Sequence, residues 1–286
     1  MPGWERKKVL ITVRTYPSPA QKTIEASCTA GITEDGQWIR LFPIPWRLLA
    51  DRQKFRKYQW IELSVRKATS DVRPESYTAD CDSITILSDV PPANGWQARK
   101  DLIYPLRKHC MCCIAQERDI AKWPTLGIFK PREIQRLRIV PEKVPTWTQD
   151  ELAKLNQSLF RVVDGKVIPD GSTRAPLEKI PMNFVYEFRC DHEDCKGHKM
   201  SSTDWEICQS YRDWRDQYGK DGWESKFRQR WEQDMLTRFD THFYVGTMHG
   251  HPATWLIVGA FYPPVQPPSA SAGPPSRPQQ LKLLTD

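Results

Sequence analysis

Strand-sized apolar stretches, several of them alternating with polar residues, dominate the first half of the chain. Residues 8–13, 23–32, 37–42 and 58–66 are rich in β-branched and aromatic residues, a composition typical of β-strands. The run Glu34-Asp35-Gly36 separates the second and third stretches and predicts a hairpin turn. Further along, the pattern predicts a helix over about 96–118, a strand over 133–140 and a helix over 148–160 that Thr148 caps, with Glu151 three residues on.

The second half of the chain mixes strands with helices. A strand over 182–188 precedes a loop rich in cysteine and histidine. Aromatic residues then recur at helical spacing over 207–218 and again over 227–239, and the run 219–222 (GKDG) interrupts them, which predicts a helical hairpin. Two closing strands are expected over 242–247 and 254–262.

The elements together predict an α+β protein of two domains. Residues 1–160 form a β-rich domain that we expect to bind nucleic acid, and residues 161–180 form a connector. Residues 181–262 form a β-αα-ββ domain that zinc stabilises, and the Pro/Ser-rich residues 263–286 are expected to be disordered.

The motif CDHEDCKGH at residues 190–198 carries the clearest chemistry. Zinc binds four thiolates and imidazoles tetrahedrally, and closely spaced pairs of these groups preorganise such a site. A structural zinc would supply the core that this polar loop lacks, whereas the alternative is a loop of chance composition. The predicted ligands are Cys190, Cys195 and His198, with the fourth from His192 or, if the fold brings one in, from Cys208 or His242.

The remaining cysteines are interpreted in the light of cellular location. No apolar run reaches membrane-spanning length and no secretory leader is evident, so we expect a cytoplasmic protein. The cytosol keeps thiols reduced, so eight cysteines do not indicate a disulfide framework. The second cluster, HCMCC at 109–113, contains Cys110 and Cys113 inside the predicted helix, and we interpret these as buried helix cysteines.

Two acids after the metal loop allow an enzymatic alternative. A metal-dependent nuclease or phosphodiesterase would use His198, Asp204 and Glu206 near the metal. The structural interpretation assigns Thr203 and Glu206 to a capping box at the start of a helix. We favour the capping box, because it explains both acids without a reaction.

Residues 38–60 combine cations with aromatic rings, and the whole chain has a net charge of +7. Cations that meet phosphates and rings that stack on bases are typical of nucleic-acid surfaces. On strand 37–42, Trp38, Arg40 and Phe42 are expected to share one face. The alternative is a solvated basic rim around a core of rings. The predicted nucleic-acid-binding residues are Trp38, Arg40, Arg47, Arg52, Lys54, Arg56 and Lys57.

The block DVRPES at 71–76 holds Arg73 two residues before Glu75. This arginine either orients a substrate or ties down a loop through an ion pair with Glu75. We favour the ion pair.

The C-terminal residues predict a protein binding partner. The run QLKLL at 280–284 is similar to the bacterial sliding-clamp-binding peptide, which places a glutamine before apolar residues. Its tether, Pro263–Gln279, would reach on the order of 50 Å if it were polyproline-like at about 3.1 Å per residue. The predicted partner-binding residues are Gln280, Leu281, Leu283 and Leu284.

Several blocks spread along the chain resemble those of an uncharacterised bacterial protein family. They are AGITEDGQWIRLFPIP, RPES, LGIFKP, the C-x4-C-x2-H loop with DWE, and the closing FYVGT and WLIVGAFYP. The resemblance implies a coherent bacterial protein and assigns no catalytic residue. We expect a DNA-associated protein in genome maintenance or defence, recruited to DNA by the clamp. The alternatives are the metal-dependent nuclease and a small-ligand or modified-base sensor.

Overall fold

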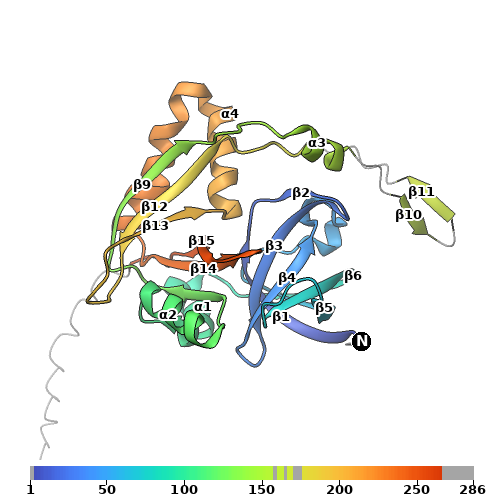
Figure 1. Ribbon diagram of the computed structural model, residues 1–286, viewed down its shortest axis with the longest axis horizontal. Coiled ribbons are helices and arrows are strands. Elements are labelled where there is room, and N and C mark those ends of the chain that lie inside the picture. The colour runs from blue at the N-terminus through green and yellow to red at the C-terminus, as the bar shows by residue number, and fades with distance from the viewer. Residues whose placement is uncertain (1–2, 157–159, 164–165, 170–175, 266–286) are drawn as a thin grey trace, which may run out of the picture.

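The structure is a computed structural model that describes residues 3–156, 160–163, 166–169 and 176–265. It confirms the α+β class: strands predominate and the helices are few (Figure 1). Of the tail predicted to be disordered over 263–286, residues 266–286 with the clamp-binding peptide lie outside the described residues. Residues 263–265 are described and, contrary to the prediction, are ordered by backbone hydrogen bonds to Arg238 and Asp240. Within the described part of the chain, no helix is both long enough and apolar enough to cross a membrane.

The first part of the chain closes into a five-stranded barrel. Its strands are paired in the order β1-β5-β6-β4-β3, and β3 pairs back to β1 to close the ring, while β2 extends from β3. Only the contact between β4 and β6 is parallel. The strands are β1 (Glu5–Arg14), β2 (Ser18–Ala20), β3 (Ile24–Thr33), β4 (Trp38–Ile44), β5 (Gln59–Lys67) and β6 (Ser76–Asp89).

The barrel strands alternate inward and outward side chains, and the inward ones form an apolar core. Val9, Ile39, Leu41, Ile61 and Leu63 are all at most 1% exposed. The strands predicted over 8–13, 23–32, 37–42 and 58–66 are confirmed. Strand β6 was not predicted because its side chains are mostly polar and half-buried, so its pattern is that of a loop.

The second part of the fold is a seven-stranded sheet in the order β7-β8-β14-β15-β13-β12-β9. Strands β7, β8 and β9 precede residues 161–180 in the chain and still share this sheet with later strands. Strand β9 pairs with β12 along its whole length, from Glu133 to Pro141. The strands are β7 (Arg107–Lys108), β8 (Leu126–Phe129), β9 (Glu133–Pro141), β12 (Met182–Arg189), β13 (His198–Ser202), β14 (His242–Met248) and β15 (His251–Phe261). A separate hairpin contains β10 (Phe160–Val163) and β11 (Lys166–Pro169).

The single helix predicted over 96–118 is wrong. The chain forms α1 (Ala93–Ile103) and α2 (Met111–Ala121), and a 3-10 turn containing Pro105 separates them. A proline lacks the backbone N–H that an uninterrupted helix needs, so the first helix ends before it. Helix α3 (Gln149–Leu155) has the predicted capping box between Thr148 and Glu151.

The predicted helical hairpin corresponds to α4 (Trp205–Arg228) and the short helical turns after it. Gly219 has a φ of 73° inside α4, a left-handed conformation that glycine adopts readily, and the helix reverses in Figure 1. The rings of Tyr211 and Trp223, 4.7 Å apart, join the two arms. A π-helical turn, Gln229–Gln233, and α5 (Asp234–Thr237) complete this helical segment.

The start of α4 corrects another prediction. Thr203 is not the N-cap: Asp204 is, and its carboxylate accepts the backbone N–H of Glu206 at 3.0 Å. The prediction also missed strand β13, which lies between the metal loop and this helix. The barrel and the sheet meet here, because Thr15 at the end of β1 forms a β-bridge with Asp204.

Candidate metal centre and junction pocket

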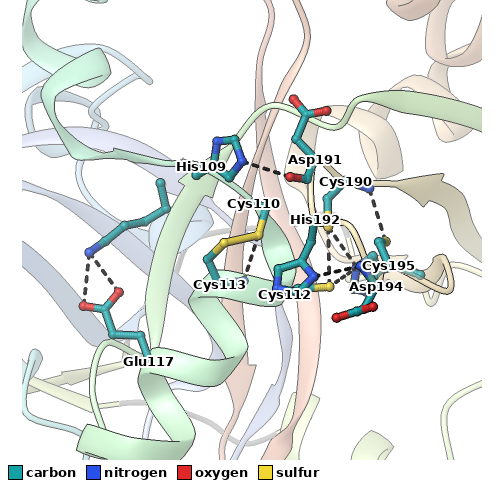
Figure 2. Close-up of a disulfide and its surroundings, with 12 residues drawn as sticks. His109, Cys110, Cys112, Cys113, Glu117, Cys190, Asp191, His192, Asp194 and Cys195 are labelled. Atoms are coloured by element: carbon teal, nitrogen blue, oxygen red, sulfur yellow. Dashed lines mark hydrogen bonds and ion pairs between the residues drawn. A yellow bond between two sulfur atoms is a disulfide. The ribbon is translucent and has the colours of Figure 1, made fainter.

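Three cysteines and one histidine converge beside the end of β12. Cys112 lies in the first turn of α2, Cys190 follows β12 directly, Cys195 lies in the loop and His198 begins β13. Their ligand atoms all lie within 4.8 Å of one another. The distances from His198 Nε2 are 3.4 Å to Cys112 Sγ and 3.5 Å to Cys190 Sγ, and the Sγ atoms of Cys112 and Cys190 are 3.5 Å apart. Figure 2 shows the three cysteines together.

These separations suit a tetrahedral metal ion. Bonds of about 2.3 Å to sulfur and about 2.0 Å to nitrogen would place neighbouring ligand atoms roughly 3.5–3.8 Å apart. Cys112, Cys190, Cys195 and His198 therefore could hold a metal ion. A set of three thiols and one imidazole leaves no open position for a substrate.

The β-hairpin between β12 and β13 positions two of the ligands. Phe188 pairs with His198 across the two strands, and their rings stack with centroids 5.0 Å apart. Gly197 has a φ of 92°, which lets the loop turn just before His198. The backbone N–H of Cys190 points at Cys195 Sγ at 3.4 Å. Burial raises the pKa of the Cys195 thiol, but the N–H groups of Cys190 and Gly197 outweigh it and lower that pKa overall.

The fourth member of this cluster is not one of the residues predicted as the fourth ligand. His192 stays in the loop, where its Nδ1 lies 3.2 Å from the backbone N–H of Asp194. Cys208 is buried in the apolar core, and burial raises its pKa. His242 is fully buried elsewhere, with Nδ1 2.9 Å from the Asp240 carbonyl and Nε2 3.3 Å from Arg107. Cys112 is the fourth member of the cluster instead.

The segment HCMCC therefore has a different role from the one predicted. Cys110 and Cys113 form a disulfide at the start of α2, and Cys110 is the N-cap of that helix. His109 contacts the carbonyl of Asp191 through Nε2 at 2.9 Å, which ties the segment to the metal loop (Figure 2). One signal could have identified Cys112: once Cys110 and Cys113 pair, the third cysteine is left beside them.

A pocket of about 430 Å³ opens where the barrel meets the sheet. We call it the junction pocket. It combines aromatic rings with four cations and two acids. Its lining residues are Ile11, Arg14, Trp46, Phe55, Arg56, Lys57, Tyr58, Trp96, Arg99, Asp204, Trp205, Glu206 and Tyr262.

Arg14 lies between two indole rings in this pocket. Its Cζ is 3.7 Å from the ring centroid of Trp46 and 4.4 Å from that of Trp205. Burial lowers its pKa to about 10, against the attraction of Asp204 and Glu206. Its Nη1 is buried and has no hydrogen-bond partner among the described residues. A buried donor of this kind is costly to leave unpaired.

A second cation in the pocket is fully compensated. Lys57 Nζ donates at 2.8 Å to both Glu206 and the Ala260 carbonyl, and lies 3.9 Å from Asp204. Burial alone would lower the pKa of Lys57, but the two carboxylates raise it. Burial raises the pKa of Asp204 to about 6 despite Lys57, whereas Lys57 outweighs burial at Glu206 and lowers its pKa.

The predicted nucleic-acid-binding residues have different environments in the structure and do not form one surface. Arg40 is 2% exposed, and it contacts Cys28 Sγ at 3.3 Å and Glu75 at 3.5 Å, so it does not present its charge to a phosphate outside the protein. Trp38, Arg40 and Phe42 do share one face of β4, as predicted, because Ile39 and Leu41 between them point into the barrel core. That face is covered at Arg40, so the expectation that it presents a phosphate ligand is wrong. Burial of Arg40 allows the guanidinium to join the barrel to Thr125 of the second part of the chain.

The other cations of residues 38–60 have carboxylate neighbours or lie exposed. Lys54 pairs with Asp51 at 2.8 Å, and Arg52 lies exposed. Arg47 pairs with Glu25 at 3.1 Å, Arg56 pairs with Asp89 at 2.7 Å, and Trp38 packs edge-on against Tyr244. Arg56 and Lys57 line the junction pocket, so the basic stretch contributes to one site there rather than to a continuous surface.

The three residues proposed for nuclease catalysis, His198, Asp204 and Glu206, do not lie at one site. His198 belongs to the metal cluster. Asp204 lies six residues further along the chain, two residues beyond the end of β13, which is roughly 20 Å for extended backbone at about 3.3 Å per residue. Asp204 caps α4, and Glu206 pairs with Lys57. The acids therefore serve the junction pocket and not the metal.

Two family models cover nearly the whole chain. One, described as a domain of unknown function (DUF8758), matches residues 5–105, and the other, described as a domain of unknown function (DUF8757), matches residues 107–282. The division falls between the barrel, with α1, and the seven-stranded sheet. No curated protein matches the chain.

Proposed function

We propose that this chain, which belongs to the family described as a domain of unknown function (DUF8757), binds nucleic acid at the junction pocket and is stabilised by zinc. The observation that carries the proposal is Arg14, whose guanidinium lies between Trp46 and Trp205 with Nη1 unpaired among the described residues. Single-stranded nucleic acids are bound by grooves that combine cations with stacking rings.

The charges of the pocket favour an anionic ligand. Its four cations are Arg14, Arg56, Lys57 and Arg99, against the two acids Asp204 and Glu206. Arg99 stacks on Tyr58 and Trp96, with its Cζ 4.2 Å and 4.5 Å from their ring centroids. The excess of positive charge agrees with the net charge of +7 of the whole chain.

Zinc is proposed as a structural ion. The four-ligand set is closed, and the loop that holds most of it contributes little to the apolar core. The ion would join α2 to the turn between β12 and β13. It would thereby hold the sheet whose β15 carries Ala260, the carbonyl that accepts from Lys57 in the junction pocket.

Binding is tested with fluorescently labelled single- and double-stranded oligonucleotides of DNA and RNA. Affinity should fall as salt rises from about 50 to about 200 mM. Arg14→Met should weaken binding about tenfold or more, since loss of one stacking or charged contact at a base is worth about 1–3 kcal/mol. Arg6→Met is the matched control, because Arg6 is exposed and pairs with Glu62. Equal affinity of both variants at unchanged melting temperature would refute the proposal.

The proposal includes recruitment to DNA by a bacterial sliding clamp, in genome maintenance or defence. It rests on the sequence QLKLL at 280–284 and the Pro-rich tether before it. A pull-down of the clamp should succeed with the full chain and fail both with a chain that ends at Gln279 and with Gln280→Ala/Leu283→Ala. Equal capture by all three, or by none, would remove the clamp from the proposal.

A further inference from the structure

A second cavity of about 400 Å³ lies on the other side of the contact between barrel and sheet. Thr15 and Thr203 line it, whereas their neighbours Arg14 and Asp204 line the junction pocket. Successive side chains in extended backbone point to opposite sides, so one pair of strand ends separates the two spaces. The second cavity is therefore a distinct site.

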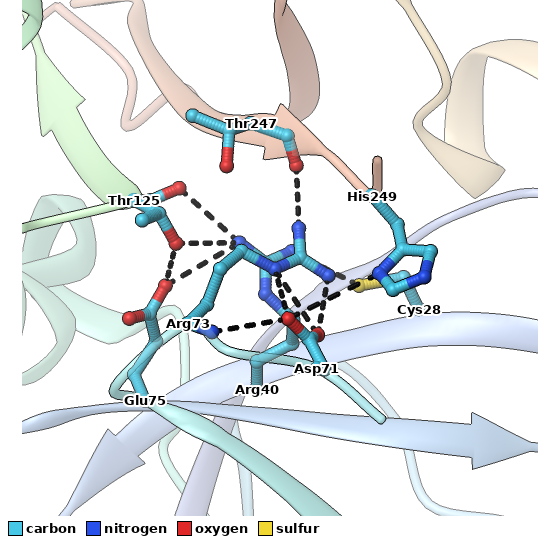
Figure 3. Close-up of polar contacts among 8 residues, drawn as sticks. All are labelled: Cys28, Arg40, Asp71, Arg73, Glu75, Thr125, Thr247 and His249. Carbon is cyan, nitrogen blue, oxygen red and sulfur yellow. Dashed lines mark hydrogen bonds and ion pairs between the residues drawn. The ribbon is translucent and has the colours of Figure 1, made fainter. Parts of the chain in front are cut away.

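An arginine and an aspartate form one wall of the second cavity. Arg73 Nε donates to Asp71 Oδ1 at 2.8 Å and Nη2 donates to Oδ2 at 2.6 Å, while Nη1 donates to the Thr247 carbonyl at 2.6 Å (Figure 3). The expected pair of Arg73 with Glu75 is wrong, because Glu75 lies beside Arg40. The prediction that Arg73 ties down a loop holds, with Thr247 as the anchor.

The pair retains hydrogen-bonding capacity toward the cavity. A guanidinium has five N–H donors, and the three bonds above leave one on Nη1 and one on Nη2. The side chains of Arg73 and Asp71 are each 13% exposed. Asp71 Oδ1 also accepts from the backbone N–H of Arg73 at 3.2 Å, so the acceptor capacity that remains beside these donors is on Oδ2. Arg73 thus offers N–H groups next to an acceptor on Asp71, in one wall.

The charges around the cavity favour a neutral ligand. Arg73 is balanced by Asp71, and the other buried cation, Arg40, is balanced by Glu75. Burial raises the pKa of the Asp71 carboxyl, but the hydrogen bonds and charge of Arg73 outweigh it and lower this pKa to about 2. Asp71 therefore stays ionised. A charged ligand would meet no unpaired counter-charge among these arginine and acid pairs and would lose part of its hydration.

The remaining walls favour a flat ligand with apolar faces. Phe42, Leu256 and Val258 contribute apolar surface. Thr247 Oγ1 is buried and has no hydrogen-bond partner in the described part of the chain. A volume of about 400 Å³ lies in the range of small-molecule sites, about 300–1,000 Å³.

We propose that the second cavity binds a nucleobase, a neutral flat heterocycle with an N–H donor beside an acceptor. Asp71 accepts from the ligand N–H, and Arg73 donates to the neighbouring ligand acceptor. The base comes either from a free nucleoside or from a strand out of which it has been turned. The proposal does not rest on the junction pocket, because the two sites share no lining residue.

Calorimetric titration of the full chain with uridine, cytidine, adenosine and guanosine tests the ligand, with ribose as the control that lacks a base. At least one nucleoside should bind and ribose should not. Blocking the edge of the best binder, for example in 3-methyluridine in place of uridine, should weaken binding about tenfold or more, since a bidentate contact to a base is worth about 1–3 kcal/mol. Failure of all four nucleosides to bind, or equal binding of the blocked form, would overturn the proposal.

Variants test the site. Asp71→Ala/Arg73→Ala keeps the local charge balanced and should abolish nucleoside binding. Leu256→Trp should do the same by filling the space, without touching the ion pair. Arg14→Met should retain nucleoside binding, so that failure of the junction pocket and failure of this cavity are separable. Binding that persists in both cavity variants would overturn the assignment.

A competition experiment identifies the source of the base. If a single-stranded oligonucleotide displaces the bound nucleoside, the ligand is a base within a strand. If the nucleoside resists displacement, the ligand is the free nucleoside. Both results require binding at the same cavity. Displacement that persists in Asp71→Ala/Arg73→Ala would count against the cavity.

Discussion

The candidate metal centre draws three of its four residues from nine consecutive positions, Cys190 to His198, whereas the junction pocket collects its lining from Ile11 to Tyr262. The metal ligands lie on a short hairpin with one helical contribution. The pocket depends on the barrel, the start of α4 and the end of β15 together. The two sites therefore depend on different sources of stability.

At the metal centre an ion would replace missing apolar contacts, because the loop between β12 and β13 is mostly exposed between its ligands. At the junction pocket the protein supplies its own compensation, since Glu206 and Asp204 surround Lys57. Removal of one ligand should therefore affect folding through the metal. Removal of one charge in the pocket should destabilise the fold because the oppositely charged group stays buried without its counter-ion.

Loss of Cys112 is expected to have the largest effect. Cys112→Ser should lose the metal and destabilise the chain by several kcal/mol, because the binding energy of a structural zinc, about 10–16 kcal/mol in small domains, contributes directly to folding. Cys195→Ser should behave in the same way. The measurements are elemental analysis of the purified protein and urea unfolding.

The control for this prediction is His192→Ala. His192 lies in the same loop, where its side chain contacts the backbone N–H of Asp194 and its carbonyl, which the substitution keeps, accepts from Cys195, so this variant should keep a full complement of zinc. Wild-type protein free of metal would exclude the metal centre altogether. A zinc-containing Cys112→Ser variant would show that His192 or another group can complete the set.

The ligands that lie close together in the sequence could be predicted, and the distant one could not. Cys190, Cys195 and His198 form a recognisable spacing, but Cys112 is 78 residues from Cys190. It reaches the loop only because Pro105 ends α1, so that α2 begins at Met111. A helix over 96–118 without a break would have placed the cysteines elsewhere.

The same limit applies to the fold and to the pocket. Strands with apolar alternation were predicted correctly, whereas β6 and β13 have polar or half-buried patterns that do not distinguish them from loops. Lys57 could be recognised as a cation. Its burial depends on Glu206, 149 residues away, and no local pattern indicates that distance.

Lys57→Met is expected to have the second-largest effect. The change leaves Glu206 and Asp204 buried without their cation, and breaking a buried ion pair in this way costs about 3–5 kcal/mol. Urea unfolding measures the loss. The double variant Lys57→Met/Glu206→Gln should recover part of it, because the uncompensated charge is removed. A single variant as stable as the wild type would mean that water already reaches Lys57.

A pH titration of stability examines a histidine that belongs to neither site. Burial lowers the pKa of His242 from 6.5 to about 4. Between these values the unfolded chain binds a proton that the folded chain excludes, so stability should fall as the pH drops from about 6.5 to about 4. The integrated loss is about 3 kcal/mol. His242→Gln should flatten this part of the curve.

The same variant tests the metal ligands. His242→Gln should keep its zinc, since His242 contacts Asp240 and Arg107 instead of the cluster. The difference between the two pH curves isolates His242 from any acid release of the metal, which both proteins share. Loss of zinc from His242→Gln would show that His242 is a zinc ligand after all.

The smallest change in stability is expected from the exposed cations beside the junction pocket. Replacement of Arg52, Lys54 and Arg56 by Glu spares Lys57, whose reversal would place a third carboxylate beside Glu206 and Asp204. Exposed ion pairs such as that of Arg56 with Asp89 contribute little to folding, so the urea midpoint should barely move. Affinity for DNA should nevertheless fall. It should also depend less on salt: the slope of log affinity against log salt concentration should become shallower by roughly 0.9 for each phosphate that the variant no longer neutralises. A weaker salt dependence at unchanged stability would extend the nucleic-acid interface from the pocket to its rim. An unchanged slope would confine it to the lining residues of the pocket other than Arg56, with Arg14 between its two indoles as the centre of recognition.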